Sequence, residues 1–266
     1  MALNDMGPPD LKRAERRTRL FMIFLGLVFL ATFLTILDWN LLERYGPRFL
    51  RGVGVTFKLV LISVGIGSAV ALPVALARLS ANRLVNNLAL GYITFFRGTP
   101  LLAQLFLVYY GTGQFREAME AVNLWWFFRD PFFCAALTFT LNTTAYQAEI
   151  LRGAIQSVPK GQWEAGHALG LSRAVTFLKV ILPQAYIIAL RPLGNELILM
   201  IKGSAVASVV TVFDIMGTTR LAFSRSFDFQ VYLWAAVLYL FIVETIRIAW
   251  SFIERRLTRH LRVSRS

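Results

Sequence analysis

The residue types that most often carry out chemistry are scarce and scattered in this sequence. His167 and His260 are the two histidines, and Cys134, the single cysteine, lies within an apolar run. A closed structural zinc site needs several such ligands held together, and their spacing does not favour that. The phosphate-binding pattern G-x-x-x-x-G-K-[ST] is also absent, so the chain has no ATP-binding loop of that type. The sequence therefore predicts no metal site, no cofactor and no enzymatic activity in this chain.

Charged residues instead interrupt apolar stretches that are long enough to cross a membrane. Glu196 and Lys202 stand within Tyr186–Phe213, and Arg97 stands within Leu88–Tyr110. An ionisable side chain inside a membrane span is costly, which makes it a candidate for function.

Glu196 allows two interpretations that the sequence leaves open. In the first, its carboxylate faces a substrate pathway, with Asn195 and Lys202, and attracts the cationic part of a substrate. In the second, it forms an ion pair with Arg191 or Arg97 that fixes helix packing. At ~100° of rotation per residue, Glu196 and Lys202 lie well apart around a helix, so they need not pair with each other.

The segment around Arg97 predicts a break in its helix. Gly98, Thr99 and Pro100 follow directly, and glycine and proline disfavour a continuous helix. Unwound backbone is tolerated inside a membrane only where it is buried in protein or lines water.

The composition supplies the apolar elements that must hold these residues. The 266 residues are 56% hydrophobic and 16% charged, against ~45–50% and ~25% in a soluble domain. The aromatic content excludes disorder, and a single cysteine excludes a disulfide-rich secreted fold. The net charge of +13 comes from basic residues beside apolar segments, which is typical of membrane topology rather than nucleic-acid binding. The predicted fold class is an all-α polytopic membrane protein.

About six transmembrane helices are expected from apolar runs near the ~20 residues that a span needs. They are Leu20–Leu37, Leu59–Ala77, a run within Leu88–Tyr110, Pro131–Ala148, Tyr186–Phe213 and Phe229–Ile253. Pro73 is expected to bend or end the second helix, and Gly65 and Gly67 to permit close helix packing. The first run is too long for a signal peptide and no small-residue cleavage site follows, so it is predicted to be a retained anchor.

The distribution of Lys and Arg predicts that both termini are cytoplasmic, because inner loops carry an excess of them. In that topology the inner segments hold 16 basic residues and the outer segments hold 7. The inner segments are 1–19, 78–87, 152–185 and 254–266.

The longest inner segment, 152–185, predicts two short helices. Gln162–Leu169 has a helix-compatible composition, and Gly170 permits a left-handed stop. Ser172 can cap the second piece, Arg173–Leu182, which is expected to end at the proline that follows. Two short helices meeting at a glycine form a rigid knob, which either docks a cytoplasmic partner or lies on the lipid surface.

This segment resembles the EAA loop of ABC importer permeases, E-A-A-x-x-x-G-x(9)-I-x-L-P. The matching residues are Glu164, Ala165, Gly170, Leu182 and Pro183. Gly166 replaces the third residue of the motif and Val180 replaces the isoleucine. Gly166 is expected to loosen its helix by up to ~1 kcal/mol relative to alanine.

Three further stretches, Phe95–Gly111, Leu137–Gln162 and Leu190–Ser208, look like polar amino-acid permeases. Within that family, the chain is most similar to the M-type subunit of histidine, basic amino-acid and opine importers. The resemblance implies a permease domain at 45–255. Residues 1–44 then hold a cytoplasmic tail and an extra helix added to a five-helix core, and 256–266 form a basic cytoplasmic tail.

The resemblance also implies partners and a mechanism. Two ATPase subunits, which bind ATP and Mg²⁺, would grip the EAA loops of two permease subunits, the second being a similar Q-type chain or another copy. A periplasmic binding protein would deliver polar amino acids to a pathway that alternates access across the bacterial inner membrane. Glu164 and Gly170 would carry the coupling, and Arg97–Pro100 would lie at a gate or a subunit interface.

Two other function classes stay open from the residues alone. An ion-coupled secondary transporter would work without an ATPase, and it predicts inverted repeats with broken helices in matching halves. A membrane assembly scaffold would leave Glu196 and Lys202 without a purpose.

Overall fold

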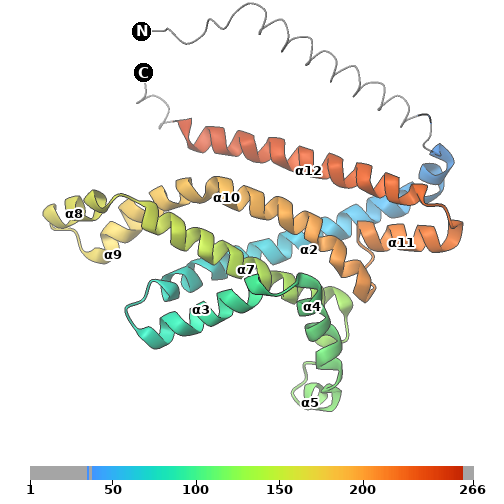
Figure 1. Cartoon of the computed structure of the whole chain (residues 1–266), viewed down its shortest axis with the longest axis horizontal. Coiled ribbons are helices and arrows are strands. Elements are labelled where there is room, and N and C mark those ends of the chain that lie inside the picture. The colour runs from blue at the N-terminus through green and yellow to red at the C-terminus, as the bar shows by residue number, and fades with distance from the viewer. Residues whose placement is uncertain (1–34, 36–37, 260–266) are drawn as a thin grey trace, which may run out of the picture. The chain divides into compact units, whose positions relative to one another are not determined.

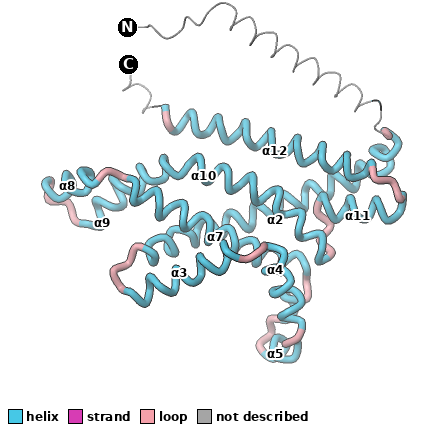
Figure 2. Tube along the Cα trace, viewed as in Figure 1, coloured by secondary structure: helices cyan, strands magenta, loops and turns pink. Residues whose placement is uncertain are grey.

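The computed structural model describes residue 35 and residues 38–259. Every regular element in this described range is a helix (Figures 1 and 2). The expected first span, Leu20–Leu37, lies almost entirely outside these residues, as do the N-terminal tail and residues 260–266. By its internal contacts the chain divides after Arg44, and the unit from Tyr45 onward carries the features that follow.

Five longer helices form most of this unit. They are α2 (Trp39–Arg78), α3 (Arg83–Gly98), α7 (Pro131–Ser157), α10 (Leu182–Gly203) and α12 (Gln230–Leu257). Shorter helical pieces connect them: α4 (Leu101–Phe106), η1 (Leu107–Gly111), α5 (Arg116–Ala121), α6 (Trp125–Phe128), α8 (Lys160–Ala168), α9 (Arg173–Thr176), η2 (Phe177–Ile181), η3 (Ser204–Val210) and α11 (Ile215–Ser226).

Three helical runs in the described range are long and apolar enough to cross a membrane: Trp39–Arg78, Arg173–Val210 and Gln230–Leu257. The third expected span is split between α3 and the α4–η1 piece, with Thr99 and Pro100 between them. The expected break in this region is therefore present, and the structure does not establish six spans.

The second span begins earlier than predicted, and it ends one residue after the predicted Ala77. The helix α2 begins at Trp39, well before the expected Leu59, and it continues past Pro73 to Arg78. Its first half was missed because it is amphipathic rather than uniformly apolar: Tyr45 and Phe49 are buried four residues apart, with the charged Arg48 between them.

Two apolar cores lie at opposite ends of the unit, and α2, α7 and α10 run through both. One core gathers around Phe139, Met200 and Ile215, and the other around Ala148, Leu151 and Ala185. Figure 1 shows α7 and α10 side by side, with α3 against α7 and α12 against α10. Between the two cores, α2, α7 and α10 bury polar side chains instead.

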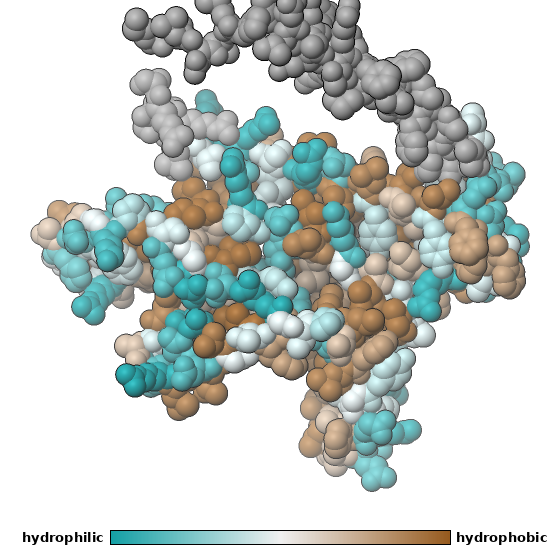
Figure 3. Space-filling model, in the orientation of Figure 1, coloured by the Kyte–Doolittle hydropathy of each residue, from teal (hydrophilic) through white to brown (hydrophobic). Residues whose placement is uncertain are grey.

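The surface fits a protein surrounded by lipid. Large apolar side chains on α12 are widely exposed, among them Leu240 at 63% and Phe241 at 70%. Hydrophilic residues gather at the tip of α5 and among the residues of α8 and α9 in the space-filling view (Figure 3). Exposed leucine and phenylalanine on a long apolar helix are expected where the neighbours are lipid tails.

Candidate functional site

A cavity of about 260 Å³ lies where the α3–α4 break meets α7 and α10. Its lining residues are Thr99, Leu101, Asn142, Tyr146, Glu196, Leu199, Met200 and Gly203. Four of them carry polar side chains, and the rest are apolar or glycine. A mostly apolar hollow with a few converging polar groups is the usual form of a small-molecule site.

Glu196 is the one carboxylate that lines this cavity, and its side chain is 6% exposed. Its Oε1 atom accepts a hydrogen bond from the Thr143 hydroxyl at 3.1 Å. Thr143 in turn accepts from the Gln147 amide at 3.1 Å, and the Gln147 carbonyl oxygen accepts from Ser68 at 2.7 Å. The chain of bonds therefore runs from α2 through α7 and ends at the carboxylate.

Glu196 forms no ion pair within the part of the chain that the structure describes. Arg191, one of its two candidate partners from the sequence, pairs instead with Glu254 of α12 at 2.5 Å. The packing interpretation through Arg191 is therefore wrong. A buried carboxylate without a counter-cation is expensive, and it favours a position where a cation can arrive from outside.

The helix break beside the cavity is stabilised by side-chain amides. Pro100 has no N–H, so the Phe96 carbonyl one turn earlier loses its helical donor. Gln104 Nε2 donates to that carbonyl at 2.9 Å, and Asn142 Nδ2 donates to it at 3.0 Å. Asn142 Nδ2 also donates to the side-chain Oε1 of Gln104 at 3.0 Å. Gln104 and Asn142 thus satisfy backbone that would otherwise be unpaired in the membrane.

Arg97 is not one of the residues that line the cavity. Its guanidinium stacks on the Tyr146 ring at 5.3 Å, and Tyr146 lines the cavity. The arginine therefore contacts a residue of the cavity wall.

Only some of the pathway and gate residues predicted from the sequence lie at the cavity. Glu196 and Thr99 line the cavity, and Gly98 and Pro100 form the break beside it. Asn195 and Lys202 are exposed elsewhere on α10, because their directions differ from that of Glu196 around the helix axis.

Sequence reasoning missed Tyr146 and Gln104 as cavity and break residues. The sequence does contain a pattern that indicates Tyr146. Asn142 and Tyr146 are four residues apart, as are Thr143 and Gln147, so these polar residues fall on one side of a helix.

The second candidate site is the α8–α9 loop, which follows the predicted local structure closely. Gly170 has φ of +71°, and its N–H donates to the His167 carbonyl at 2.9 Å. Leu171 N–H donates to the Gly166 carbonyl at 3.0 Å, which completes a Schellman turn. The Ser172 hydroxyl then accepts from Val175 N–H at 3.3 Å and caps α9. The predicted stop at Gly170 and the predicted cap at Ser172 are confirmed.

The residues of the EAA-like motif have different surroundings in the loop. Glu164 and Ala165 are exposed on α8, whereas Gly166 is buried against α9. Leu182 is half-buried and Pro183 is exposed, and both lie at the start of α10.

The expected helix end at Pro183 is wrong, because the helical run continues through the π turn η2 into α10. A π turn widens the helix just before the proline, which relieves the clash that a proline ring makes with the preceding turn. Gln184 Nε2 donates to the Val180 carbonyl at 2.9 Å and to Gln162 of α8 at 3.2 Å, which ties α10 to the knob.

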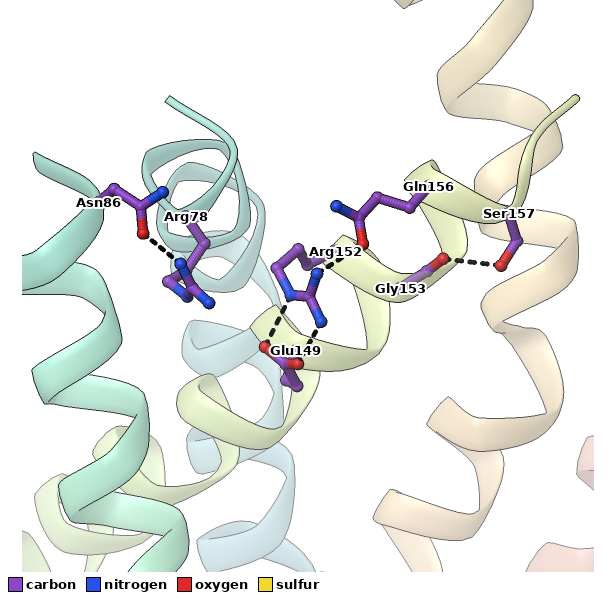
Figure 4. Close-up of polar contacts among 7 residues, drawn as sticks. All are labelled: Arg78, Asn86, Glu149, Arg152, Gly153, Gln156 and Ser157. Atoms are coloured by element: carbon purple, nitrogen blue, oxygen red, sulfur yellow. Dashed lines mark hydrogen bonds and ion pairs between the residues drawn. The ribbon is translucent and has the colours of Figure 1, made fainter. Parts of the chain in front are cut away.

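A polar cluster lies near the C-terminal end of α7 (Figure 4). The Arg152 guanidinium donates to both oxygens of Glu149, at 2.9 and 2.5 Å, and also to Gln156. Arg78, at the end of α2, donates to Asn86 of α3. The contacts among Glu149, Arg152 and Gln156 lie within α7, and the contact between Arg78 and Asn86 joins α2 to α3.

No group of three or more His, Cys, Asp or Glu side chains that could hold a metal ion occurs within residues 38–259. Cys134, which the sequence places in an apolar run, is buried in α7.

Comparison with known proteins gives consistent matches. Residues 59–263 match the family described as binding-protein-dependent transport system inner membrane component. The nopaline transport system permease protein of Agrobacterium fabrum is 42% identical over 227 residues, which cover 85% of this chain and 94% of that protein. The arginine ABC transporter permease protein of Escherichia coli is 39% identical over 166 residues, which cover 62% of this chain and 74% of that protein.

A solved structure shares the fold. The crystal structure of an amino acid ABC transporter with histidines has a TM-score of 0.74 and 35% identity, covering 82% of this chain and 98% of that chain. These relatives are ABC permeases, and they do not support an ion-coupled secondary transporter. The chain therefore belongs to the family of binding-protein-dependent transport system inner membrane components, the multi-pass permease subunits of ABC importers, which act with ATPase and substrate-binding partners.

Proposed function

We propose that this chain carries polar amino acids with a cationic group, such as basic amino acids, histidine or opines, from the periplasm to the cytoplasm. It pairs with a second permease subunit, either a similar Q-type chain or another copy. Two ATPase subunits bind ATP and Mg²⁺ on the cytoplasmic side, and a periplasmic binding protein delivers the substrate. ATP-driven closure of the ATPases switches the pathway between its inward-open and outward-open forms.

The observation that carries the substrate proposal is the buried Glu196 carboxylate in its cavity. It has one hydrogen-bond donor, Thr143, and no ion-pair partner within the described chain. A cavity of 260 Å³ is smaller than the ~300–1,000 Å³ of sites for drug-sized ligands, which suits a single amino acid. The resemblance to permeases named for arginine and nopaline also supports a cationic substrate.

The helix break at Arg97–Pro100 is proposed as part of the gate. It borders the cavity through Thr99 and lies at the end of α3. Because its backbone is held by Gln104 and Asn142 rather than by a continuous helix, it can change its angle without losing every hydrogen bond. Asn195 and Lys202 stay proposed as pathway residues in another conformation or across the subunit interface.

The α8–α9 loop is proposed as the ATPase dock. Glu164 and Ala165 are exposed, and the Schellman turn and the Ser172 cap hold them on a rigid frame. The excess of basic residues in the segments 1–19, 78–87, 152–185 and 254–266 supports a cytoplasmic position for this loop and for both termini.

The test is purification of the tagged chain from its native membranes in mild detergent, with identification of the proteins that accompany it. The unaltered chain is expected to bring an ATPase and a permease subunit with it. Glu164→Ala and Gly170→Ala are expected to lose the ATPase, since the first removes an exposed charge and the second strains a backbone with φ of +71°.

Matched variants control for general damage. Glu117→Ala changes an exposed glutamate of α5, and Gly153→Ala changes a glycine of α7 with open space around its Cβ position. Both are expected to keep the ATPase. Recovery of the chain alone, from membranes that still support ATP-independent uptake, would contradict the importer mechanism.

A further inference from the structure

Gly166 of α8 is in unusually close contact with Thr176 of α9. A Cβ atom added at Gly166 would lie 2.6 Å from both Thr176 Cγ2 and Thr176 Oγ1, and 3.2 Å from Thr176 Cβ. Carbon atoms attract each other best at ~3.5–4.0 Å, so an alanine cannot occupy position 166 unless one of the two helices moves.

Thr176 is not free to turn away. Its side chain is 2% exposed, and its hydroxyl donates to the Ser172 carbonyl at 3.1 Å. A β-branched residue in a helix has few rotamers. The next residue, Phe177, stacks on Trp163 of α8 with ring centroids 6.3 Å apart and an interplanar angle of 19°. A larger residue at 166 would therefore displace α8 rather than the threonine.

A displacement of α8 would move the surface that faces the cytoplasm. Glu164 and Ala165 directly precede Gly166 and are exposed on the same short helix. The Gly166 carbonyl also accepts from Leu171 N–H, so the residue belongs to the Schellman turn that fixes the angle between the helices. The glycine is thus required by packing, and this accounts for the departure from alanine at the third position of the motif.

We propose that Gly166 and Thr176 are a matched pair that sets the distance between α8 and α9, which makes Thr176 a positioning residue for coupling to the ATPase. The pair rests on the proposed function, in which α8 and α9 form the ATPase dock. A small side chain at position 176 would allow alanine at position 166. Threonine at position 176 requires glycine at position 166.

The test uses the assembled transporter and the variants Gly166→Ala, Thr176→Ala and the double variant. Gly166→Ala is expected to lower the maximal uptake rate and the recovery of ATPase about tenfold, the size of effect that an overpacked contact produces, with the substrate KM unchanged. Thr176→Ala removes both close atoms and is expected to have a small effect by itself. The double variant, in which the closest remaining distance is the 3.2 Å to Cβ, is expected to recover uptake to within about twofold of the unaltered chain.

Two matched variants separate this pairing from general damage to the loop. Gly161→Ala makes the same change in the same helix, where nothing lies within 4 Å of the added Cβ, and it is expected to be harmless. Thr176→Val keeps both branches of the side chain, so it is expected not to restore Gly166→Ala. The amount of each variant in the membrane is measured alongside.

The outcomes distinguish the pair from the dock. Loss of the ATPase in Glu164→Ala and Gly170→Ala, together with full coupling in Gly166→Ala, would overturn the pair and leave the dock. Failure of Thr176→Ala to restore Gly166→Ala, or equal restoration by Thr176→Val, would also overturn it. Retention of the ATPase in every one of these variants would instead reject the dock, and the coupling role of the pair with it.

Discussion

The α8–α9 loop and the Glu196 cavity are built in opposite ways. In the loop, the bonds that set the shape join near neighbours, such as Leu171 N–H to the Gly166 carbonyl and Val175 N–H to Ser172. In the cavity, the bond from Thr143 to Glu196 spans 53 positions. The loop is therefore encoded by a short stretch of sequence, and the cavity by the packing of several helices.

This difference predicts how damage spreads through the molecule. A change at a polar or glycine position of the loop alters a few local bonds, whereas Trp163 of α8 packs against one of the two apolar cores. A change beside the cavity reaches Glu196 through a chain of side chains that starts at Ser68 on α2 and passes through Gln147 and Thr143. Cavity variants should consequently change substrate selection, and loop variants should change coupling.

The largest effect is expected from Glu196→Gln, which removes the charge and keeps the shape. Loss of a charge-assisted contact should lower uptake of a cationic amino acid such as arginine roughly 10- to 100-fold. Uptake of an uncharged amino acid, where it occurs, should change much less. Measurement of uptake of both substrates in whole cells checks this.

Glu244→Gln is the matched control for that variant, because Glu244 pairs with Arg247 within α12 and does not line the cavity. It should leave both substrates unaffected. Equal uptake of every substrate by the Glu196→Gln variant and the unaltered chain would show that the carboxylate does not meet the substrate.

A smaller effect is expected from Gly67→Ala on α2. Its Cβ would lie 2.6 Å from Thr143 Cγ2, so it should displace the residue that bonds Glu196 and cost about 1–3 kcal/mol of stability. Gly65→Ala, two residues earlier, meets nothing within 4 Å and should be neutral or slightly stabilising. Thermal unfolding of the two purified variants in detergent compares them, and equal melting would argue against the close α2–α7 contact.

The smallest effect is expected from Ser172→Ala, which removes the cap of α9. Such a loss typically costs ~1 kcal/mol, and here it should stay within the loop. Hydrogen exchange should quicken at the first amides of α9 and remain unchanged in α7. Faster exchange around Thr143 as well would mean that the loop and the cavity are coupled more tightly than their separate hydrogen bonds indicate.

Prediction from the sequence succeeded where the physics is local. The left-handed stop at Gly170 and the cap at Ser172 follow from the sequence alone, because backbone sterics and capping need only neighbouring residues. Prediction failed at Pro183, where the π turn η2 allows the helical run to continue through the proline. It also failed for Gly65, which the sequence does not distinguish from Gly67 although only Gly67 packs closely.

The cavity was only partly predictable, because only some of its features depend on neighbouring residues. Glu196 was identified because a charge in an apolar helix is conspicuous, and the break at Pro100 because proline lacks an N–H. Excluding a partnership between Glu196 and Arg191 needed the position of α12, whose Glu254 pairs with that arginine.

The residue order alone therefore determines an all-helical membrane protein, although not the number or the ends of its spans. It also determines the break at Pro100 and the turn at Gly170, since hydrophobicity, proline chemistry and backbone sterics act over a few positions. The packing of α2, α3, α7 and α10 decides which polar residues meet around Glu196. The packing of α8 against α9 decides that Gly166 must accommodate Thr176. Both sets of contacts depend on distances between helices, and the pattern of residues along a single helix does not predict such distances.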